Sequence, residues 1–163
     1  MTNRIAPTEA LVQTTPRPHP ARGRRETYPV IGEAKARYGD MDANGHMNNL
    51  ALEALHEDAR ATFNAQAFPG VYARTKRQVR LVSSQNVVHF MAEAHWPAVF
   101  ETGVGVGRIG NTSFVACSAI FEGSVCVSIC DTVLVALDDS GPVPIPDDVR
   151  ATLRGFTLHH RER

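Results

Sequence analysis

Polar residues stand at every second position where the regular pattern of the chain begins. Glu33, Lys35 and Arg37 alternate there with small or apolar neighbours. A period of two is typical of a β-strand with one buried face. The alternation predicts a first strand over Tyr28–Tyr38, which then runs into a turn.

Beyond this turn the period lengthens to that of a helix. Apolar residues recur at steps of three and four, which puts them on one helical face. The residues of that face are Leu52, Leu55, Ala59 and Phe63. We expect the helix from about Asn48 to Ala67, with Asn48 or Asn49 as its N-cap and Pro69-Gly70 as its end.

After the helix the pattern is that of β-strands. We expect strands over residues 77–83, 87–95, 99–109, 111–121 and 125–137, with a bulge or bend near residues 84–86. The prolines of residues 142–146 are incompatible with the interior of a sheet. A short helix is expected over Asp147–Arg154.

This order of elements predicts an α+β fold, in which one antiparallel sheet wraps around a single long central helix. Long edge strands require pairing or covering. Ten apolar residues are expected in the sheet interior or a subunit interface: Val104, Val106, Phe114, Val115, Ile120, Val125, Val127, Ile129, Val133 and Val135.

Composition indicates one soluble globular domain. The chain has 163 residues, 17.8 kDa and no formal net charge, so charge favours neither nucleic acid nor membrane as a partner. No apolar run is long enough to span a bilayer. The N-terminus is polar and proline-rich, unlike a secretory signal. Three cysteines, Cys117, Cys126 and Cys130, show no C-x-x-C spacing, which favours reduced thiols in a cytoplasmic protein.

The domain is expected to span residues 28–155. Residues 1–27 are rich in proline and arginine and lack apolar periodicity, so we interpret them as a flexible tail. Their basic cluster suits either solvent or an anionic partner such as the nucleotide end of a coenzyme. Residues 156–163 are interpreted as a C-terminal tail.

The turn before the helix carries the candidate chemistry. Asp40, Asp42, Asn44 and Gly45 favour a tight reversal because Asp and Asn bond locally and Gly tolerates positive φ. The first N–H groups of a helix point outward with about half a positive charge. A thioester or ester oxygen bound there would be polarised. A nearby carboxylate can attack that carbonyl or activate water.

The two carboxylates have different expected roles. We expect only one of Asp40 and Asp42 to face the site. Asp40 is interpreted as a loop-stabilising residue paired with Arg37. Asp42 is the candidate for chemistry, and its alternative role is that of a turn or cap residue.

The stretch RYGDMDANGHMNNLALEALHEDAR, residues 37–60, resembles the hotdog-fold acyl-CoA thioesterases of the 4-hydroxybenzoyl-CoA thioesterase type. Two later segments, GRIGNTSF and VLVALDDSGPVPIP, extend the resemblance to residues 31–153. Where that family has aromatic residues after the paired asparagines, this chain has Leu50, Ala51 and Leu52. The acyl specificity of the family therefore cannot be assumed for this chain.

The resemblance implies that Asp42 is the catalytic carboxylate and that a main-chain N–H near the helix start contacts the thioester oxygen. The backbone of Asn48 and Asn49 is the candidate donor. His46 could orient Asp42, bind the carbonyl, position water, or be structural. Gly45 is expected to shape the backbone around the substrate.

The resemblance also suggests a coenzyme A site and an assembly. Arg108, Asn111, Thr112 and Ser113 would lie beside the pantetheine arm and nucleotide, although an ordinary β-bend explains them equally well. Two subunits joined edge to edge would give a homodimer, or a homotetramer. Glu53 and Glu57, four residues apart on the helix, are second-line candidates, and Glu57 could instead pair with Arg60.

Metal motifs are present only in part. Asp40-x-Asp42-x-Asn44-Gly45 imitates an EF-hand, but its twelfth position is Ala51. His56-Glu57 lacks the second histidine of a zinc protease, because residue 60 is arginine. We therefore expect an acyl-CoA or acyl-carrier thioester as substrate and no metal or redox cofactor. A non-catalytic acyl-CoA binding module and a hotdog hydratase or dehydratase are the alternatives.

Overall fold

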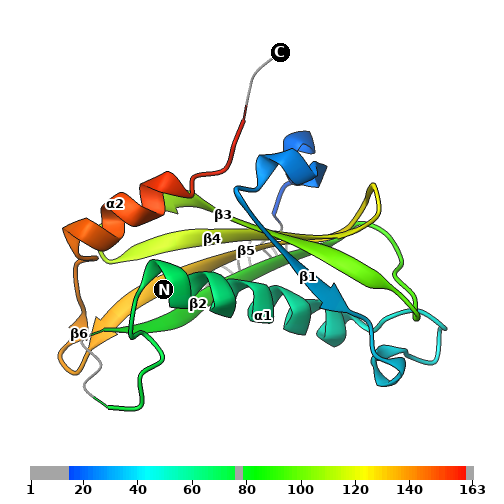
Figure 1. The fold of residues 1–163 in the computed structure, drawn as a ribbon, viewed down its shortest axis with the longest axis horizontal. Coiled ribbons are helices and arrows are strands. Elements are labelled where there is room, and N and C mark those ends of the chain that lie inside the picture. Colours follow the sequence, from blue (N-terminus) through cyan, green and yellow to red (C-terminus); the bar gives the residue numbers. More distant parts are fainter. Residues whose placement is uncertain (1–14, 76–78, 161–163) are drawn as a thin grey trace, which may run out of the picture.

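The computed structural model of the chain describes residues 15–75 and 79–160, and its centre is the helix α1 (Asn49–Ala67) (Figure 1). The side-chain oxygen of Asn48 accepts a hydrogen bond from the N–H of Ala51 at 2.7 Å and so caps the first turn. Gly70 has a φ of 82° just beyond the other end. The predicted helix and its N-cap at Asn48 are confirmed.

The sheet is antiparallel, with the order β1-β3-β4-β5-β2, and β6 pairs with β5. Its strands are β1 (Val30–Lys35), β2 (Arg80–Phe90), β3 (Val99–Ile109), β4 (Ser113–Glu122), β5 (Val125–Asp138) and β6 (Gly141–Pro142). A second helix, α2 (Asp147–Gly155), follows. The chain before β1 and before α1 also forms short 3-10 turns, at Pro20–Gly23, Arg25–Thr27 and Tyr38–Asp40.

The sheet curves around α1, and β1 crosses the helix (Figure 1). One part of the core surrounds the C-terminal half of α1, where Phe63 packs with Phe114 and with Leu153 of α2. Another part surrounds the N-terminal half, where Leu52 packs with Phe100. This is the α+β hotdog fold that the element order and the resemblance predict.

Strand boundaries differ from the sequence prediction most in β1 and β2. β1 begins after Tyr28, because that side chain turns into the outer face of the sheet and packs on Phe121. β2 is one strand with an irregular register between Ser83 and Gln85, as the predicted bulge requires, but it ends at Phe90 instead of His95. Residues 91–98 lie outside the strands, and the carbonyl of Ala94 accepts the N–H of Met47 in the loop before α1.

Proline also enters the sheet where it was not expected. Pro142 forms part of β6 and pairs with Leu137, so the exclusion of residues 142–146 was wrong at this position. The pairing is possible because β6 is two residues long and lies at an edge, where an N–H is dispensable.

The expected interior residues divide between the two faces of the sheet. Six of them are buried, namely Val104, Val106, Phe114, Ile120, Val127 and Ile129. Three valines are half-buried on the outer face of β4 and β5 (Val115, Val133 and Val135), and Val125 is half exposed.

Parts of both predicted tails lie against this outer face. The Arg22 guanidinium is 2.7 Å from the Asp131 carboxylate of β5, and the N–H of Leu158 donates to the Val106 carbonyl of β3. A Cβ on Gly103 would lie 2.6 Å from the ring of Tyr28, so the absence of a side chain there makes room for this covering. Residues 1–14 and 161–163 of the predicted tails lie outside the described residues.

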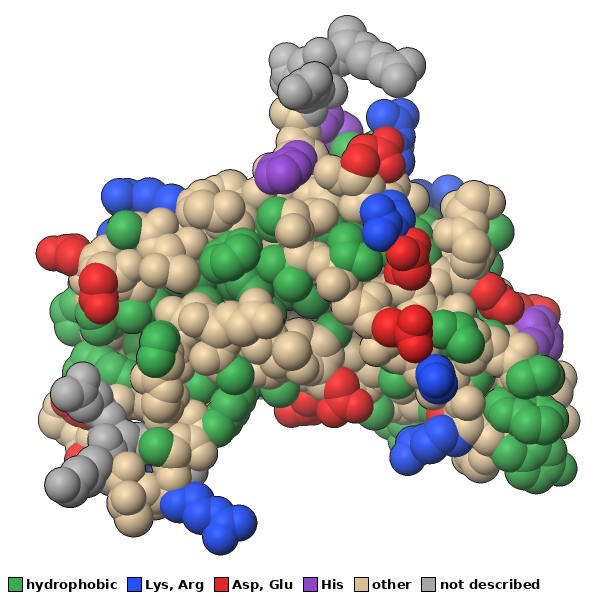
Figure 2. Space-filling model, in the orientation of Figure 1, with side chains coloured by type: hydrophobic (Ala, Val, Ile, Leu, Met, Phe, Trp, Pro, Cys, Tyr) green, Lys and Arg blue, Asp and Glu red, His purple; other side chains and the backbone are tan. Residues whose placement is uncertain are grey.

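Acidic and basic side chains alternate over the visible face of the molecule, with no region of one sign (Figure 2). This agrees with the absence of net charge. No helix within residues 15–75 and 79–160 has the length and apolar character needed to cross a membrane.

Candidate active site

Asp42 lies in a tight loop between β1 and α1. Its N–H donates to the carbonyl of His46 at 2.9 Å, and its own carbonyl accepts from the N–H of Gly45 at 3.1 Å. Gly45 has a φ of 84°, which explains the glycine at this turn. The Asp42 carboxylate accepts from the N–H of Asn44 at 2.7 Å. The side chain of Asp42 is about a quarter exposed, at 28%, so it is ordered yet accessible.

Asp40 has a different environment, although it is only two residues away. Its carboxylate is 6% exposed and accepts hydrogen bonds from the backbone N–H and the guanidinium of Arg37. The interactions with Arg37 hold the pKa of Asp40 below its usual range. The expected pairing with Arg37 is confirmed, and this carboxylate is not free for chemistry.

The first turn of α1 offers N–H groups without partners. Asn48 donates its own N–H to Asp40, and the N–H of Ala51 is taken by Asn48. The N–H groups of Asn49 and Leu50 have no hydrogen-bond partner among the described residues. Neither residue is buried, so a carbonyl oxygen can reach these donors.

His46 lies between Asp42 and a pocket. Its Nδ1 is 3.7 Å from an Asp42 carboxylate oxygen. The pocket, of about 250 Å³, reaches the start of α1 at Asn49 and has mostly apolar walls. Its lining is His46, Met47, Asn49, Leu52, Phe90, Met91, Ala92, Glu93 and Ala94. Exposed hydrophobic side chains gather at this end of the molecule (Figure 2).

The Arg108–Ser113 segment lies near the C-terminal end of α1, whereas Asp42 precedes the N-terminal end of that helix. It forms the β3–β4 turn, where Arg150 of α2 donates to the carbonyls of Gly110 and Asn111. α2 packs beside the C-terminal half of α1 through the rings of Phe63 and Phe156. α1 has 19 residues, so roughly 28 Å of helix separates this turn from Asp42. Within one chain, Arg108, Asn111, Thr112 and Ser113 do not meet Asp42.

The second-line carboxylates line a different pocket from the one at His46, although that second pocket also reaches Leu50. Glu53 and Glu57 are exposed and line a separate pocket of about 230 Å³ with Arg60. Glu57 lies 3.6 Å from the Arg60 guanidinium, as the sequence suggested. Neither carboxylate lines the pocket at His46.

Two features of this region escaped sequence analysis. The N–H of Leu50 lacks a partner among the described residues because the side chain of Asn48 caps Ala51 instead. No residue type in the sequence indicates which N–H is capped. The pocket wall at Ala92, Glu93 and Ala94 was assigned to a strand because its alternation continues that of β2. The dipeptide Trp96-Pro97, which favours a turn, was a weak indication that β2 ends earlier than its alternation predicts.

Cysteine chemistry has no support in the described part of the chain. Cys117 and Cys130 are buried, Cys126 is half-buried, and all three are free thiols. Burial raises the pKa of each, that of Cys117 to about 12, so a thiolate nucleophile is disfavoured. Within residues 15–75 and 79–160, no three His, Cys, Asp or Glu side chains are grouped to hold a metal ion. The expectation of no metal stays a prediction.

Comparison with known families identifies one match. A family model described as the thioesterase-like superfamily matches residues 28–153, most of the chain. A search of curated proteins found no match.

Solved structures share the fold. A protein of Pseudomonas aeruginosa is 24% identical, covers 85% of this chain and 99% of its own, and has a TM-score of 0.76. A predicted thioesterase of Bacillus stearothermophilus is 26% identical, covers 80% and 98%, and has a TM-score of 0.72. A thioesterase of Thermus thermophilus, complexed with coenzyme A and Zn, is 22% identical, covers 80% and 96%, and has a TM-score of 0.71.

Proposed function

We propose that this chain, which belongs to the thioesterase-like superfamily, hydrolyses an acyl-CoA thioester to the free acid and coenzyme A. The observation that carries the proposal is the start of α1. There an accessible carboxylate and two helical N–H groups without a partner among the described residues lie in one short segment, and a mostly apolar pocket reaches the same helix start. The narrower relationship to 4-hydroxybenzoyl-CoA thioesterases rests on the sequence motif.

The thioester oxygen would bind at the N–H groups of Asn49 and Leu50. These donors and the helix dipole stabilise the negative charge that develops on this oxygen during attack. Asp42 then acts in one of two ways. It attacks the carbonyl carbon to form a mixed anhydride, which water then hydrolyses to the free acid, or it removes a proton from a water molecule that attacks the carbonyl. On either route CoA leaves as a thiolate that takes up a proton.

His46 would hold the geometry of this step. Its distance of 3.7 Å from Asp42 allows it to orient the carboxylate, and it also contacts the pocket. The acyl group would occupy the pocket of about 250 Å³, whose apolar walls include Leu52, Phe90 and Met91. The Thermus thermophilus protein complexed with coenzyme A supports a CoA ester as the substrate. An acyl-carrier thioester would present the same reactive group.

A homodimer would complete the site. Among the described residues β2 pairs only with β5, so its other edge is open for pairing. Antiparallel pairing of two β2 edges about a two-fold axis reverses the second copy. The Arg108–Ser113 turn of the second copy then lies at the same end as Asp42. There the Arg108 guanidinium would meet a phosphate of CoA, and the polar turn would meet the pantetheine arm.

The test measures free thiol released by the purified protein from acyl-CoA esters of different length and shape. Asp42→Asn should lower kcat by roughly 10²–10⁴-fold, because it removes the attacking or proton-accepting group. Melting temperature and CoA affinity should stay near those of the wild type. The matched control is Asp139→Asn, which changes an acidic residue in the loop after β5.

Other outcomes would overturn parts of the proposal. Full turnover by Asp42→Asn contradicts the catalytic role of that residue. Binding of CoA esters without thiol release from any of them would favour a non-catalytic binding module. Addition of water to an enoyl-CoA, with the thioester intact, would favour a hydratase.

A further inference from the structure

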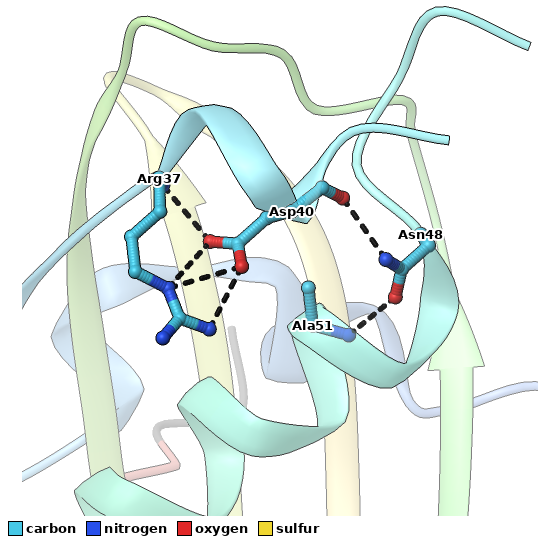
Figure 3. Close-up of polar contacts among 4 residues, drawn as sticks. All are labelled: Arg37, Asp40, Asn48 and Ala51. Atoms are coloured by element: carbon cyan, nitrogen blue, oxygen red, sulfur yellow. Dashed lines mark hydrogen bonds and ion pairs between the residues drawn. The ribbon is translucent and has the colours of Figure 1, made fainter. Parts of the chain in front are cut away.

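The loop that carries Asp42 is joined to the start of α1 by hydrogen bonds through one residue, Asp40. The carbonyl of Asp40 accepts two hydrogen bonds from Asn48. One comes from the backbone N–H at 2.9 Å, and the other from the side-chain amide at 3.1 Å (Figure 3). The side-chain oxygen of the same asparagine accepts a hydrogen bond from the N–H of Ala51. Asp40 is therefore joined directly to the residue that begins α1.

The side chain of Asp40 is held from the opposite direction. Arg37 donates its backbone N–H at 2.8 Å and its guanidinium Nη2 at 2.8 Å to the two carboxylate oxygens (Figure 3). The Asp40 carboxylate is almost completely enclosed, while the Arg37 side chain is 78% exposed. Bidentate contact of this kind sets orientation as well as distance.

Met47 anchors the other end of the loop in the core, where Met41 also packs, but the remainder of the loop makes few hydrogen bonds to other described segments. Most of its hydrogen bonds are internal, such as those between Asp42 and His46 or between Asp42 and Asn44. The loop contacts the neighbouring segment through the N–H of Met47, which donates to Ala94 at 2.7 Å. A shift of Asp40 would therefore displace the nearby Asp42 carboxylate from the helix start.

We propose that Arg37 and Asp40 are positioning residues for the thioesterase reaction, which hold Asp42 in register with the free N–H groups of α1 through the contacts of Asp40 with Asn48. This inference rests on the proposed function for its kinetic test. Neither residue needs to touch the substrate. A displacement of about 1 Å in a reacting group costs around 10²-fold in rate, so a well-held loop matters.

The rival interpretation is that Asp40 is itself the reacting carboxylate. The two differ in what loss of Arg37 does. If Arg37 positions the loop, Arg37→Gln lowers kcat, because the bidentate contact is lost. If Asp40 reacts, Arg37→Gln frees its carboxylate, so kcat stays the same or rises.

The experiment compares kcat and KM of wild type, Arg37→Gln, Arg37→Lys, Asp40→Asn and the double variant Arg37→Gln/Asp42→Asn. We expect Arg37→Gln to lower kcat about 10- to 100-fold with KM changed less than about twofold. Arg37→Lys restores part of the loss, because it keeps the charge without the fork. In the Asp42→Asn background, Arg37→Gln should cost less than about twofold, because its effect passes through Asp42.

Arg25→Gln is the matched control. Arg25 is also exposed, and its guanidinium pairs with the Glu101 carboxylate at 2.7 Å on another part of the surface. We expect wild-type kcat from this variant. A kcat for Arg37→Gln equal to that of Arg25→Gln, or a full additional loss in the Asp42→Asn background, would overturn the proposal.

Amide hydrogen exchange tests the same inference without any activity. The Asn48 N–H bonds to Asp40, so Arg37→Gln should speed its exchange by about tenfold or more, while amides in β4 keep their wild-type rates. Unchanged exchange at Asn48 refutes the positioning role even in a protein that cleaves no thioester. Faster exchange without any turnover in the wild type would instead refute the proposed function and leave the loop anchor standing.

Discussion

Burial separates the two aspartates of the loop, although they share a motif and a residue type. Asp40 is enclosed and bound by Arg37, while Asp42 stays accessible beside His46. A carboxylate that is fully engaged in hydrogen bonds is a poor nucleophile or base, because those bonds stabilise its charged form. The accessible member of the pair is therefore the better candidate for catalysis.

His56 is another residue whose surroundings determine its chemistry. It is buried in α1, with its ring nitrogens 2.8 Å from the Ser118 hydroxyl and 2.9 Å from the Ser128 hydroxyl. Burial, together with the positive charges of Arg60 and Arg22, lowers the pKa of His56 to about 3. The histidine is therefore neutral at physiological pH and serves to link α1 to β4 and β5.

This lowered pKa predicts a pH dependence of stability. Between the ordinary histidine pKa and about 3, the unfolded chain binds a proton that the folded chain does not. The contribution to the free energy of unfolding is thus intact above about pH 6.5 and declines as the pH falls, by up to about 1.4 kcal/mol per pH unit. Urea unfolding of wild type and His56→Gln from about pH 7 to 4.5 checks this.

The wild type should show the steeper loss of stability with falling pH, since residue 56 no longer titrates in the variant. Parallel curves for the two proteins would mean that His56 takes up its proton without unfolding.

At the scale of elements, the start of α1 is capped by the side chain of Asn48. The cap satisfies one orphan N–H of the first turn, and two more have no partner among the described residues. Because the same asparagine also binds Asp40, the stability of the helix start and the position of the loop are coupled.

Asn48→Ala should lower the free energy of unfolding by about 0.5–2 kcal/mol, because the cap is lost. Asn49→Ala is the control, since the Asn49 side chain has no hydrogen bond to the described residues. Its expected cost is under about 0.5 kcal/mol. Guanidinium unfolding followed by circular dichroism measures both, and equal costs would contradict the role of the cap.

The glycine at position 103 in β3 is explained by the side chain that packs against it. Gly103 faces Tyr28, and a methyl group there would overlap the ring. Gly103→Ala should therefore destabilise the fold by about 1–3 kcal/mol. Gly155→Ala, at the end of α2 with open space around it, should change stability by less than about 0.5 kcal/mol. Thermal unfolding compares them, and a neutral Gly103→Ala would show that the outer covering yields easily.

At the scale of the whole molecule, one chain separates the groups that the reaction needs. The loop that precedes α1 and carries Asp42 lies at one end of this helix, and the polar β3–β4 turn lies at the other (Figure 1). The open edge of β2 offers a way to bring a reversed second copy alongside. If the site is shared between two copies, a mixture of two inactive variants should regain activity. A site formed within one chain would not give this result.

Mixing two defective variants tests sharing. Asp42→Asn and Arg108→Ala, refolded together in equal amounts, should form about half heterodimers, each with one intact site of two. Thiol release should recover to about a quarter of the wild-type rate, well above either parent. A rate equal to the mean of the two parents would place both residues in one chain's site, and wild-type activity in Arg108→Ala would exclude Arg108 from the site.

Sequence reasoning reached the elements because their signals are local. The helix period, the N-cap at Asn48, the turn glycine at residue 45 and the β3 and β5 patterns are each set by neighbours within a few residues. The extents of β1 and β2 were less predictable, because distant partners decide where a strand leaves the sheet. Met47, for example, draws residue 94 away from β2.

The candidate loop, its helix and the roles expected of Asp40 and Arg37 could be predicted from residue types and spacing, because a turn and a helix start are built from consecutive residues. The tertiary structure alone decided which N–H groups stay free, which wall closes the pocket, and that Arg108 lies a helix length from Asp42. These three features depend on which distant segments of the chain come into contact. The spacing of residues along the sequence does not give the distances between those segments in space.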